Sequence, residues 1–113
     1  MKEIKAIVRT DRVQAVVKAL DRAGVARLLI CHVHSLGAGV DPEDFRVSFE
    51  EGATYTEKCK VEVVCGDDAA DDVVDVIAEA ARTGQPGDGI IIVSDVERVT
   101  NVRTGDEGAL ALV

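Results

Sequence analysis

The sequence predicts an α+β domain made of two copies of a strand–helix–strand unit. Residues 3–9 alternate polar and apolar side chains, as a half-exposed strand does. Apolar residues at helical spacing follow, and a second apolar strand covers residues 26–34. The same order of elements then returns at an offset of 57 residues. A duplicated unit of this kind, with element order βαββαβ, is the ferredoxin-like arrangement, in which two helices cover one sheet.

The first helix is expected to start at Thr10 or Asp11, either of which can cap it, and to end before Gly24. The second helix should start near Asp67 or Asp68 and stop before Gly84. The positions that correspond in the two copies are Ile4, Ala6 and Ile7 with Val61, Val63 and Val64, and Val16, Val17 and Leu20 with Val73, Val74 and Ile77. Chance similarity between short patterns is the alternative explanation of this match.

The last strand, Ile90–Val93, is apolar at every position. A strand that is apolar on both faces is typical of a sheet that is covered on both sides. Because the two helices can cover only one face, we expect the other face to pack against further copies of the chain.

Composition narrows the class of function. The 113 residues fit one domain, 1–113, and 21 acidic against 13 basic residues give a net charge of −8. That balance argues against nucleic acid and against an anionic membrane surface as partners, since both are bound through Lys and Arg. Residues 1–10 do not resemble a signal peptide, and Cys31, Cys59 and Cys65 have no CxxC spacing. We therefore expect a cytoplasmic protein with free thiols.

Residues 35–57 separate the two copies and are rich in glycine and acidic residues. A connection this long is uncommon in a compact domain and is usually functional or disordered. Within it, FRVSF at 45–49 alternates like a strand and could extend a hairpin. We expect a long mobile loop at 35–57 that faces a partner protein.

A glycine-rich segment, Thr83–Gly89 (TGQPGDG), follows the second helix. Three glycines in seven residues allow backbone amides to converge on an anion, although they could equally cap a helix and turn the chain. His32 and His34 lie two residues apart on one strand face, and no carboxylate or thiolate stands at a spacing that would add a third metal ligand. We find no nucleophile–base pair and no metal-binding motif, so we expect neither an enzyme nor a metal site.

Residues 83–105, TGQPGDGIIIVSDVERVTNVRTG, resemble a stretch of the PII signal-transduction family, in which TG-x-x-GDG and a strand precede DV-x-x-V-x-x-(I/V)-RTG. The resemblance continues over the whole chain, including KCKVEVVCGDD at 58–68. It implies a homotrimer of ferredoxin-like subunits with adenine nucleotides bound between neighbouring subunits. It also implies that the 35–57 loop contacts a regulated protein, for which a membrane transporter is one candidate, and that the chain ends in a tail from about residue 104.

The resemblance implies a set of nucleotide-binding residues. Gly87, Asp88 and Gly89 would offer backbone amides to the phosphates, and Lys58 and Arg103 would bring positive charge. The positions that complete the set are Gly37, where the loop packs against the nucleotide, Val64, whose backbone meets the base, and Arg98, which could instead support the subunit junction.

Three cations that the family usually places near the phosphates are replaced in this sequence. Ile90 follows GDG in place of Lys, Asn101 replaces the first Arg of R-x-R, and Ala38–Gly39 replace an Arg–Gln pair. Hydrogen bonds to charged groups contribute about 1.5–3 kcal/mol each, so we expect ADP or AMP to be favoured over ATP. Glu51 stands where some members carry a modified tyrosine, which makes uridylylation doubtful.

The physiological effector stays open at this stage. Nitrogen sensing and inorganic-carbon sensing, with bicarbonate as a further effector, both fit the resemblance, as does an association with heavy-metal efflux. The alternative is a structural or metal-responsive trimer of the CutA type that binds no nucleotide. Such a trimer would respond to metals through His32, His34 or a cysteine.

Overall fold

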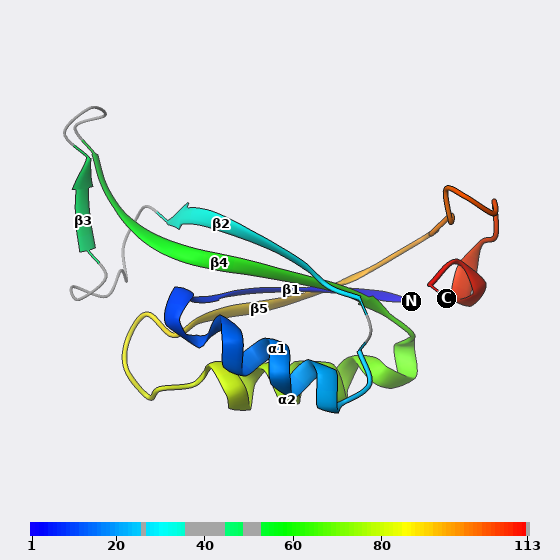
Figure 1. Cartoon of the computed structure of the whole chain (residues 1–113), viewed down its shortest axis with the longest axis horizontal. Coiled ribbons are helices and arrows are strands. Elements are labelled where there is room, and N and C mark those ends of the chain that lie inside the picture. The colour runs from blue at the N-terminus through cyan, green and yellow to red at the C-terminus, as the bar shows by residue number, and fades with distance from the viewer. Residues whose placement is uncertain (26, 36–44, 49–52, 113) are drawn as a thin grey trace.

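The computed structural model describes residues 1–25, 27–35, 45–48 and 53–112. One sheet runs along the molecule, and two helices lie side by side on one of its faces (Figure 1). The strands are β1 (Lys2–Arg9), β2 (Leu29–Ser35), β3 (Phe45–Ser48), β4 (Ala53–Cys65) and β5 (Gly89–Asp95). The helices are α1 (Val13–Arg22) and α2 (Ala70–Ala81), and the 3₁₀ turns are η1 (Thr10–Arg12), η3 (Asp67–Ala69) and η4 (Gly108–Leu112).

The strand order β2–β4–β1–β5 confirms the ferredoxin-like duplication. The two central strands, β4 and β1, each come from the start of one copy and pair antiparallel, with Ile4 opposite Val63 and Arg9 opposite Lys58. Each outer strand ends a copy: β2 pairs with β4, and β5 pairs with β1. The crossover from β1 through α1 to β2 is therefore repeated by the crossover from β4 through α2 to β5.

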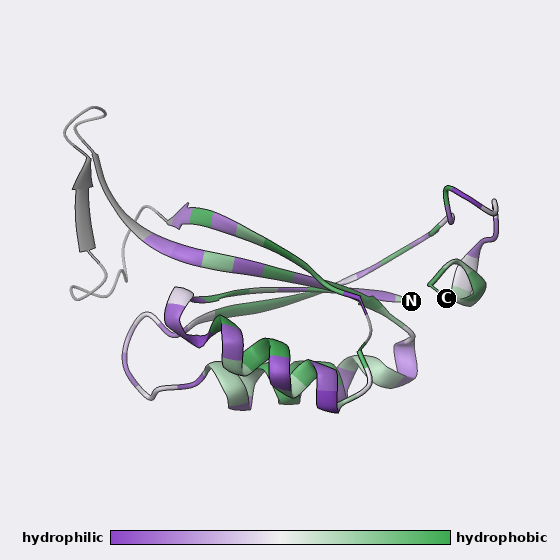
Figure 2. Ribbon diagram, in the orientation of Figure 1, coloured by the Kyte–Doolittle hydropathy of each residue, from purple (hydrophilic) through white to green (hydrophobic). Residues whose placement is uncertain are grey.

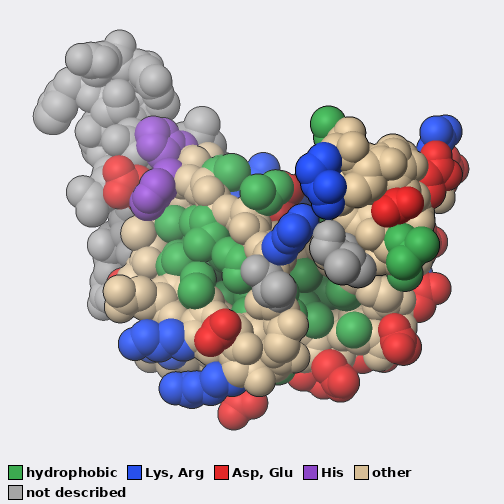
Figure 3. Space-filling view, turned by 45° about the vertical axis from the view of Figure 1, so that its right-hand side comes forward, with side chains coloured by type: hydrophobic (Ala, Val, Ile, Leu, Met, Phe, Trp, Pro, Cys, Tyr) green, Lys and Arg blue, Asp and Glu red, His purple; other side chains and the backbone are tan. Residues whose placement is uncertain are grey.

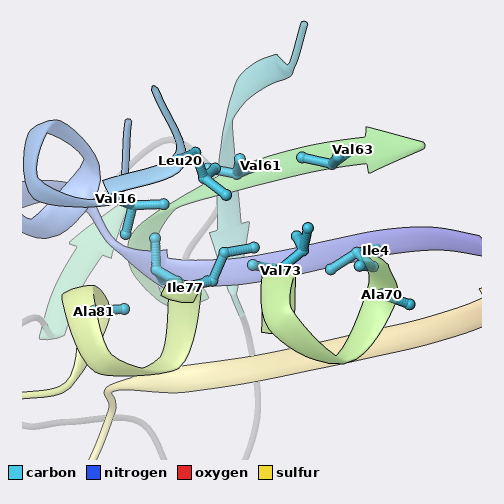
Figure 4. Close-up of a cluster of buried hydrophobic side chains, with 11 residues drawn as sticks. Ile4, Val16, Leu20, Val61, Val63, Ala70, Val73, Ile77 and Ala81 are labelled. Carbon is cyan, nitrogen blue, oxygen red and sulfur yellow. The ribbon is translucent and has the colours of Figure 1, made fainter. Parts of the chain in front are cut away.

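The core lies between the helices and the inner face of the sheet (Figure 4). Each helix turns its apolar side to the sheet and its polar side outward (Figure 2). Positions that correspond in the two copies are buried together, as the offset of 57 residues predicts. Both members of each of these pairs are buried: Ile4 and Val61, Ala6 and Val63, Val16 and Val73, Leu20 and Ile77.

The boundaries of the elements differ from the prediction in three places. Neither Thr10 nor Asp11 caps α1 with its side chain; a 3₁₀ turn, η1, precedes the helix, which begins at Val13. The second helix is preceded in the same way by η3 and begins at Ala70. β2 begins at Leu29 rather than at residue 26, which lies outside the described residues.

The stretch predicted as a loop, 35–57, is shorter than expected at its second end. Residues 53–57 belong to β4, which continues without interruption to Cys65. Residues 45–48 of the short alternation form β3, which pairs antiparallel with β4 as a hairpin extension. Residues 36–44 and 49–52 lie outside the described part, so the mobility of the loop stays a prediction.

The sheet face opposite the helices carries exposed apolar side chains. Ile90 is 58% exposed and Ile92 43%, and both pair with residues of β1 that face away from the helices. On the other edge strand, Leu29 is 66% exposed. The pattern on this opposite face is the one expected of a face that packs against other copies, which stays a prediction. Figure 3 shows a separate group of hydrophobic side chains beside the two histidines, whose strand partners Cys59 and Glu57 lie on the helix side of β4. None of the helices in the described residues is long and apolar enough to span a membrane.

Candidate functional site

The glycine-rich segment forms a loop that returns the chain from α2 to β5. It lies at the end of the sheet where β1 passes into α1 (Figure 1). Gly84 and Gly87 have left-handed φ angles of 86° and 95°. Gly89, with φ 113°, packs so tightly that a Cβ atom would lie 1.8 Å from the carbonyl oxygen of Ile7. The loop therefore requires glycine where it joins the sheet, because any side chain would collide with β1.

The carboxylate of Asp88 closes the loop on itself. One of its oxygens, Oδ2, accepts hydrogen bonds from the amides of Thr83 and Gly84, both at 2.9 Å. The other, Oδ1, accepts from the Thr83 hydroxyl and from Arg9 Nε, the latter at 3.0 Å. These hydrogen bonds, led by that of the Thr83 hydroxyl, hold the pKa of Asp88 far below its usual range. The Asp88 side chain is therefore a charged brace of the loop.

Two buried cations support the loop from the central strands. Arg9 and Lys58 are directly opposite each other in the β1–β4 register and are 8% and 5% exposed. Arg9 donates to the carbonyl of Pro86 at 2.6 Å as well as to Asp88. Lys58 Nζ donates to the carbonyl of Gly87 at 2.5 Å. Three consecutive loop residues, 86–88, are thus held by two neighbouring cations.

This arrangement suits a phosphate. Among the described residues, the backbone amides of Gly87 and Asp88 have no hydrogen-bond acceptor. The loop bonds Arg9 and Lys58 through its carbonyl and carboxylate oxygens, and these bonds do not use the two amides. The amides of Gly87 and Asp88 are therefore available to donate to an oxyanion. A loop with free amides beside a cluster of fixed positive charge can bind an anion through charge-assisted hydrogen bonds.

The structure brings Lys58, Gly87, Asp88 and Gly89 together, and places Val64 elsewhere. Val64 lies six residues along β4 from Lys58, which corresponds to ~20 Å at the rise of a strand. It lines an open, mostly apolar pocket of about 560 Å³ together with Leu29 and Leu112. Gly37 lies outside the described residues.

The segment that follows β5 and carries Arg98 and Arg103 leaves the sheet at the same end as Val64, opposite the loop (Figure 1). Arg98 is paired with Glu107, at 2.9 Å. The turn that carries Arg103 is built on Asn101, whose Oδ1 accepts from the amides of Arg103 and Thr104 at 3.0 and 3.1 Å. The Asn101 Nδ2 donates to the carbonyl of Ala111 at 3.3 Å. Asn101 therefore orders this turn with both polar atoms of its side chain.

The histidines of β2 form one contact with a cysteine. Cys59 Sγ lies 3.5 Å from His32 Nδ1, and Cys59 is buried while both histidines are exposed. Within the described part of the chain, no group of three or more His, Cys, Asp or Glu side chains could hold a metal ion.

The comparison with known proteins decides the family. The family model described as "Nitrogen regulatory protein P-II" matches residues 1–106. The chain belongs to the P-II family. A protein named "Nitrogen regulatory protein P-II" from Nostoc punctiforme is 37% identical over 112 residues, covering 99% of this chain and 100% of the relative. One of the same name from Mesorhizobium japonicum is 35% identical over 108 residues, 96% of each chain. "Nitrogen regulatory protein GlnK" of Escherichia coli is 31% identical over 112 residues, 99% of this chain and all of the relative.

Sequence reasoning missed two residues of this P-II loop. Arg9 ends an apolar strand and has the pattern of a solvated cation, whereas the structure buries it against Pro86 and Asp88. From the sequence, Thr83 is only the start of the glycine-rich segment, yet its hydroxyl and amide both donate to Asp88. The TG-x-x-GD spacing held a signal for Thr83, because a carboxylate that follows a turn can accept hydrogen bonds from the residues that begin it.

Proposed function

We propose that this P-II family protein is a regulatory subunit that binds an adenine nucleotide, with ADP or AMP favoured over ATP, in a cleft between the subunits of a homotrimer. Binding would change the 35–57 segment and so its contact with a regulated protein. The observation that carries the proposal is the loop of residues 83–88, held beside the buried cations Arg9 and Lys58 with two amides left to donate. A phosphate is the ligand group that such a loop recognises best.

The placement of the other expected residues supports a site shared between subunits. Arg103 and Val64 lie at the opposite end of the sheet from the loop, so one chain cannot bring them to the same phosphate or base. A neighbouring copy can, if its far end meets the loop of the first. The exposed apolar face that includes Ile90 and Ile92 offers a surface for that contact.

The preference for fewer phosphates rests on two replaced cations. Ile90 directly follows the loop and is an uncharged side chain that is 58% exposed. Asn101 is uncharged, and its side-chain oxygen and nitrogen are already bonded, the oxygen within its own turn and the nitrogen to Ala111 of η4. A triphosphate needs more positive charge than a monophosphate or diphosphate, so its affinity is lowered most by these replacements.

Isothermal titration with AMP, ADP and ATP, each with and without Mg²⁺, tests the proposal. We expect ADP or AMP to bind more tightly than ATP, and Lys58→Ala and Arg103→Ala to lower the affinity strongly. Repeating the titrations with 2-oxoglutarate or bicarbonate tests nitrogen against inorganic-carbon sensing; the nitrogen role is the one that the names of the relatives suggest. Tight ATP binding strengthened by 2-oxoglutarate would contradict the expected selectivity. The absence of any nucleotide binding would contradict the function itself.

A further inference from the structure

We propose that Arg9 is a positioning residue of the phosphate-binding loop: it sets the place of the loop amides and of the Lys58 ammonium by holding the residues on either side of Gly87. The proposal rests on the nucleotide-binding function proposed above and extends it to a residue outside the loop. Arg9 acts through Pro86 and Asp88 and need not touch the ligand.

The contacts of Arg9 bracket a single residue. Its guanidinium donates to the Pro86 carbonyl at 2.6 Å and, through Nε, to the Asp88 carboxylate at 3.0 Å. Gly87 lies between these two anchors and adopts a left-handed φ of 95°, a conformation that glycine reaches without a steric penalty. A flexible residue held on both sides by one rigid group has little freedom left. The orientation of its amide and carbonyl is therefore set by Arg9.

The contacts of Arg9 with the loop also affect the position of Lys58. The Lys58 ammonium donates to the carbonyl of Gly87 at 2.5 Å, so the position of that carbonyl helps to set where the ammonium lies. Arg9 and Lys58 are partners in the strand register, and both are buried. A shift of the loop away from Arg9 would therefore move the cation and the amides together, and both are needed to recognise a phosphate.

Lysine cannot replace arginine in this role. Guanidinium is a planar group with donors that point in fixed, separate directions, whereas an ammonium is a compact charge at the end of a flexible stem. Arg9→Lys would keep the positive charge of β1 but could not bridge the carbonyl of Pro86 and the carboxylate of Asp88 with the same geometry. The substitution therefore separates the geometry of the group from its charge.

The experiment compares Arg9→Lys with a matched control, Arg12→Lys. Arg12 also donates two hydrogen bonds from a guanidinium to a backbone carbonyl, that of Ala80, at 3.1 and 2.6 Å, but it joins η1 to the last turn of α2 and, among the described residues, makes no hydrogen bond to residues 83–88. For both variants and the wild type, ADP and adenosine affinities would be measured by titration. The amide chemical shifts of Gly84, Gly87 and Gly89 would be followed by NMR, and thermal unfolding would show that each variant is folded.

We expect Arg9→Lys to weaken ADP binding by about tenfold or more, the effect of one lost charge-assisted hydrogen bond, and to leave adenosine affinity within about twofold. The glycine amide shifts should move in Arg9→Lys and stay in place in Arg12→Lys. Unchanged ADP affinity in Arg9→Lys would overturn the proposal, as would an equal loss in Arg12→Lys or an equal loss for adenosine. If the wild type bound no nucleotide, the proposed function would fail, and the glycine shifts would still show whether Arg9 holds the loop.

Discussion

The two connections that lead from a helix to the following strand differ in what holds them. Residues 23–28 follow α1 and residues 82–88 follow α2, at corresponding places in the two copies. Each connection contains, shortly after its helix, a glycine with nearly the same left-handed φ angle: 87° at Gly24 and 86° at Gly84. After α1 the turn is closed by backbone groups, with Gly24 and Val25 donating to Asp21 and Leu20 at 3.0 Å.

After α2 the turn is closed by a side chain. The amide of Gly84 donates to the carboxylate of Asp88, which also binds the Thr83 hydroxyl and Arg9. Both connections therefore begin with a similar backbone turn, but in the second an acid, a hydroxyl and two buried cations meet. The backbone geometry alone does not distinguish the two connections.

The largest effect is expected from substitution of Gly89, with Gly24 of the first copy as the comparison. Gly89→Ala would place a Cβ atom 1.8 Å from the backbone of Ile7, so we expect a loss of more than about 4 kcal/mol in the free energy of unfolding. Gly24→Ala has no atom within 4 Å of the new Cβ, so only the left-handed backbone opposes it, at about 1–2 kcal/mol. Urea unfolding measures both. Equal losses would contradict the packing described for Gly89.

Substitutions in the core should destabilise the protein equally in the two copies. Leu20 and Ile77 occupy corresponding positions and are both 0% exposed. Truncation of either to alanine removes apolar volume and leaves a cavity, which costs about 2–5 kcal/mol. We expect Leu20→Ala and Ile77→Ala to lower the free energy of unfolding by similar amounts in that range. A loss below about 1 kcal/mol at one of the two positions would mean that the copies do not share one core.

The Asp88 brace predicts a particular dependence of stability on pH. The pKa of Asp88 is lowered in the folded protein, chiefly by the Thr83 hydroxyl. Its contribution to stability is therefore fully present above the ordinary carboxyl pKa of about 4, and is lost as pH falls toward the lower folded value. We expect Asp88→Asn to lower the urea midpoint by a constant amount from pH 8 to 5, with the difference from wild type shrinking below about pH 4.

Asp21→Asn, on the exposed side of α1, is the control for this experiment and should leave the midpoint unchanged at every pH. A difference between wild type and Asp88→Asn that changes between pH 8 and 5 would point to another titrating group.

A smaller effect is expected at Thr83. Thr83→Val keeps the shape of the side chain and removes the hydroxyl that donates to Asp88, so we expect a loss of about 1 kcal/mol in urea unfolding. Thr83→Ser retains the hydroxyl and should lose less than half as much. If the two variants were equally destabilised, the hydrogen bond would not be the cause.

Much of the fold could be predicted from the sequence, because the apolar spacing repeats wherever side chains enter the core. Val16 with Val73 and Leu20 with Ile77 show this directly. Helix starts could not be predicted to the residue, because a 3₁₀ turn such as Thr10–Arg12 carries the same capping residues as the first turn of an α-helix.

The site could be predicted only in part. The glycine spacing identifies Gly87 and Gly89, since their backbone angles need that residue. The burial of Arg9 depends on its contacts with Pro86 and Asp88, which lie almost 80 residues further along the chain, so the segment around Arg9 carries no sign of it. The separation of Val64 and Arg103 from the loop likewise follows from the direction in which β4 and β5 run.

The central claim is that the loop of one subunit and Arg103 of another form a single nucleotide site. Mixed trimers test it most directly: Lys58→Ala and Arg103→Ala chains would be co-expressed with different tags, and trimers that contain both would be purified. Each variant alone should lose ADP binding, and the mixed trimers should regain it at the junction where an intact Lys58 meets an intact Arg103. If the mixed trimers bound no more ADP than the single variants, while the wild type bound normally, the site would not be shared between these residues of two subunits.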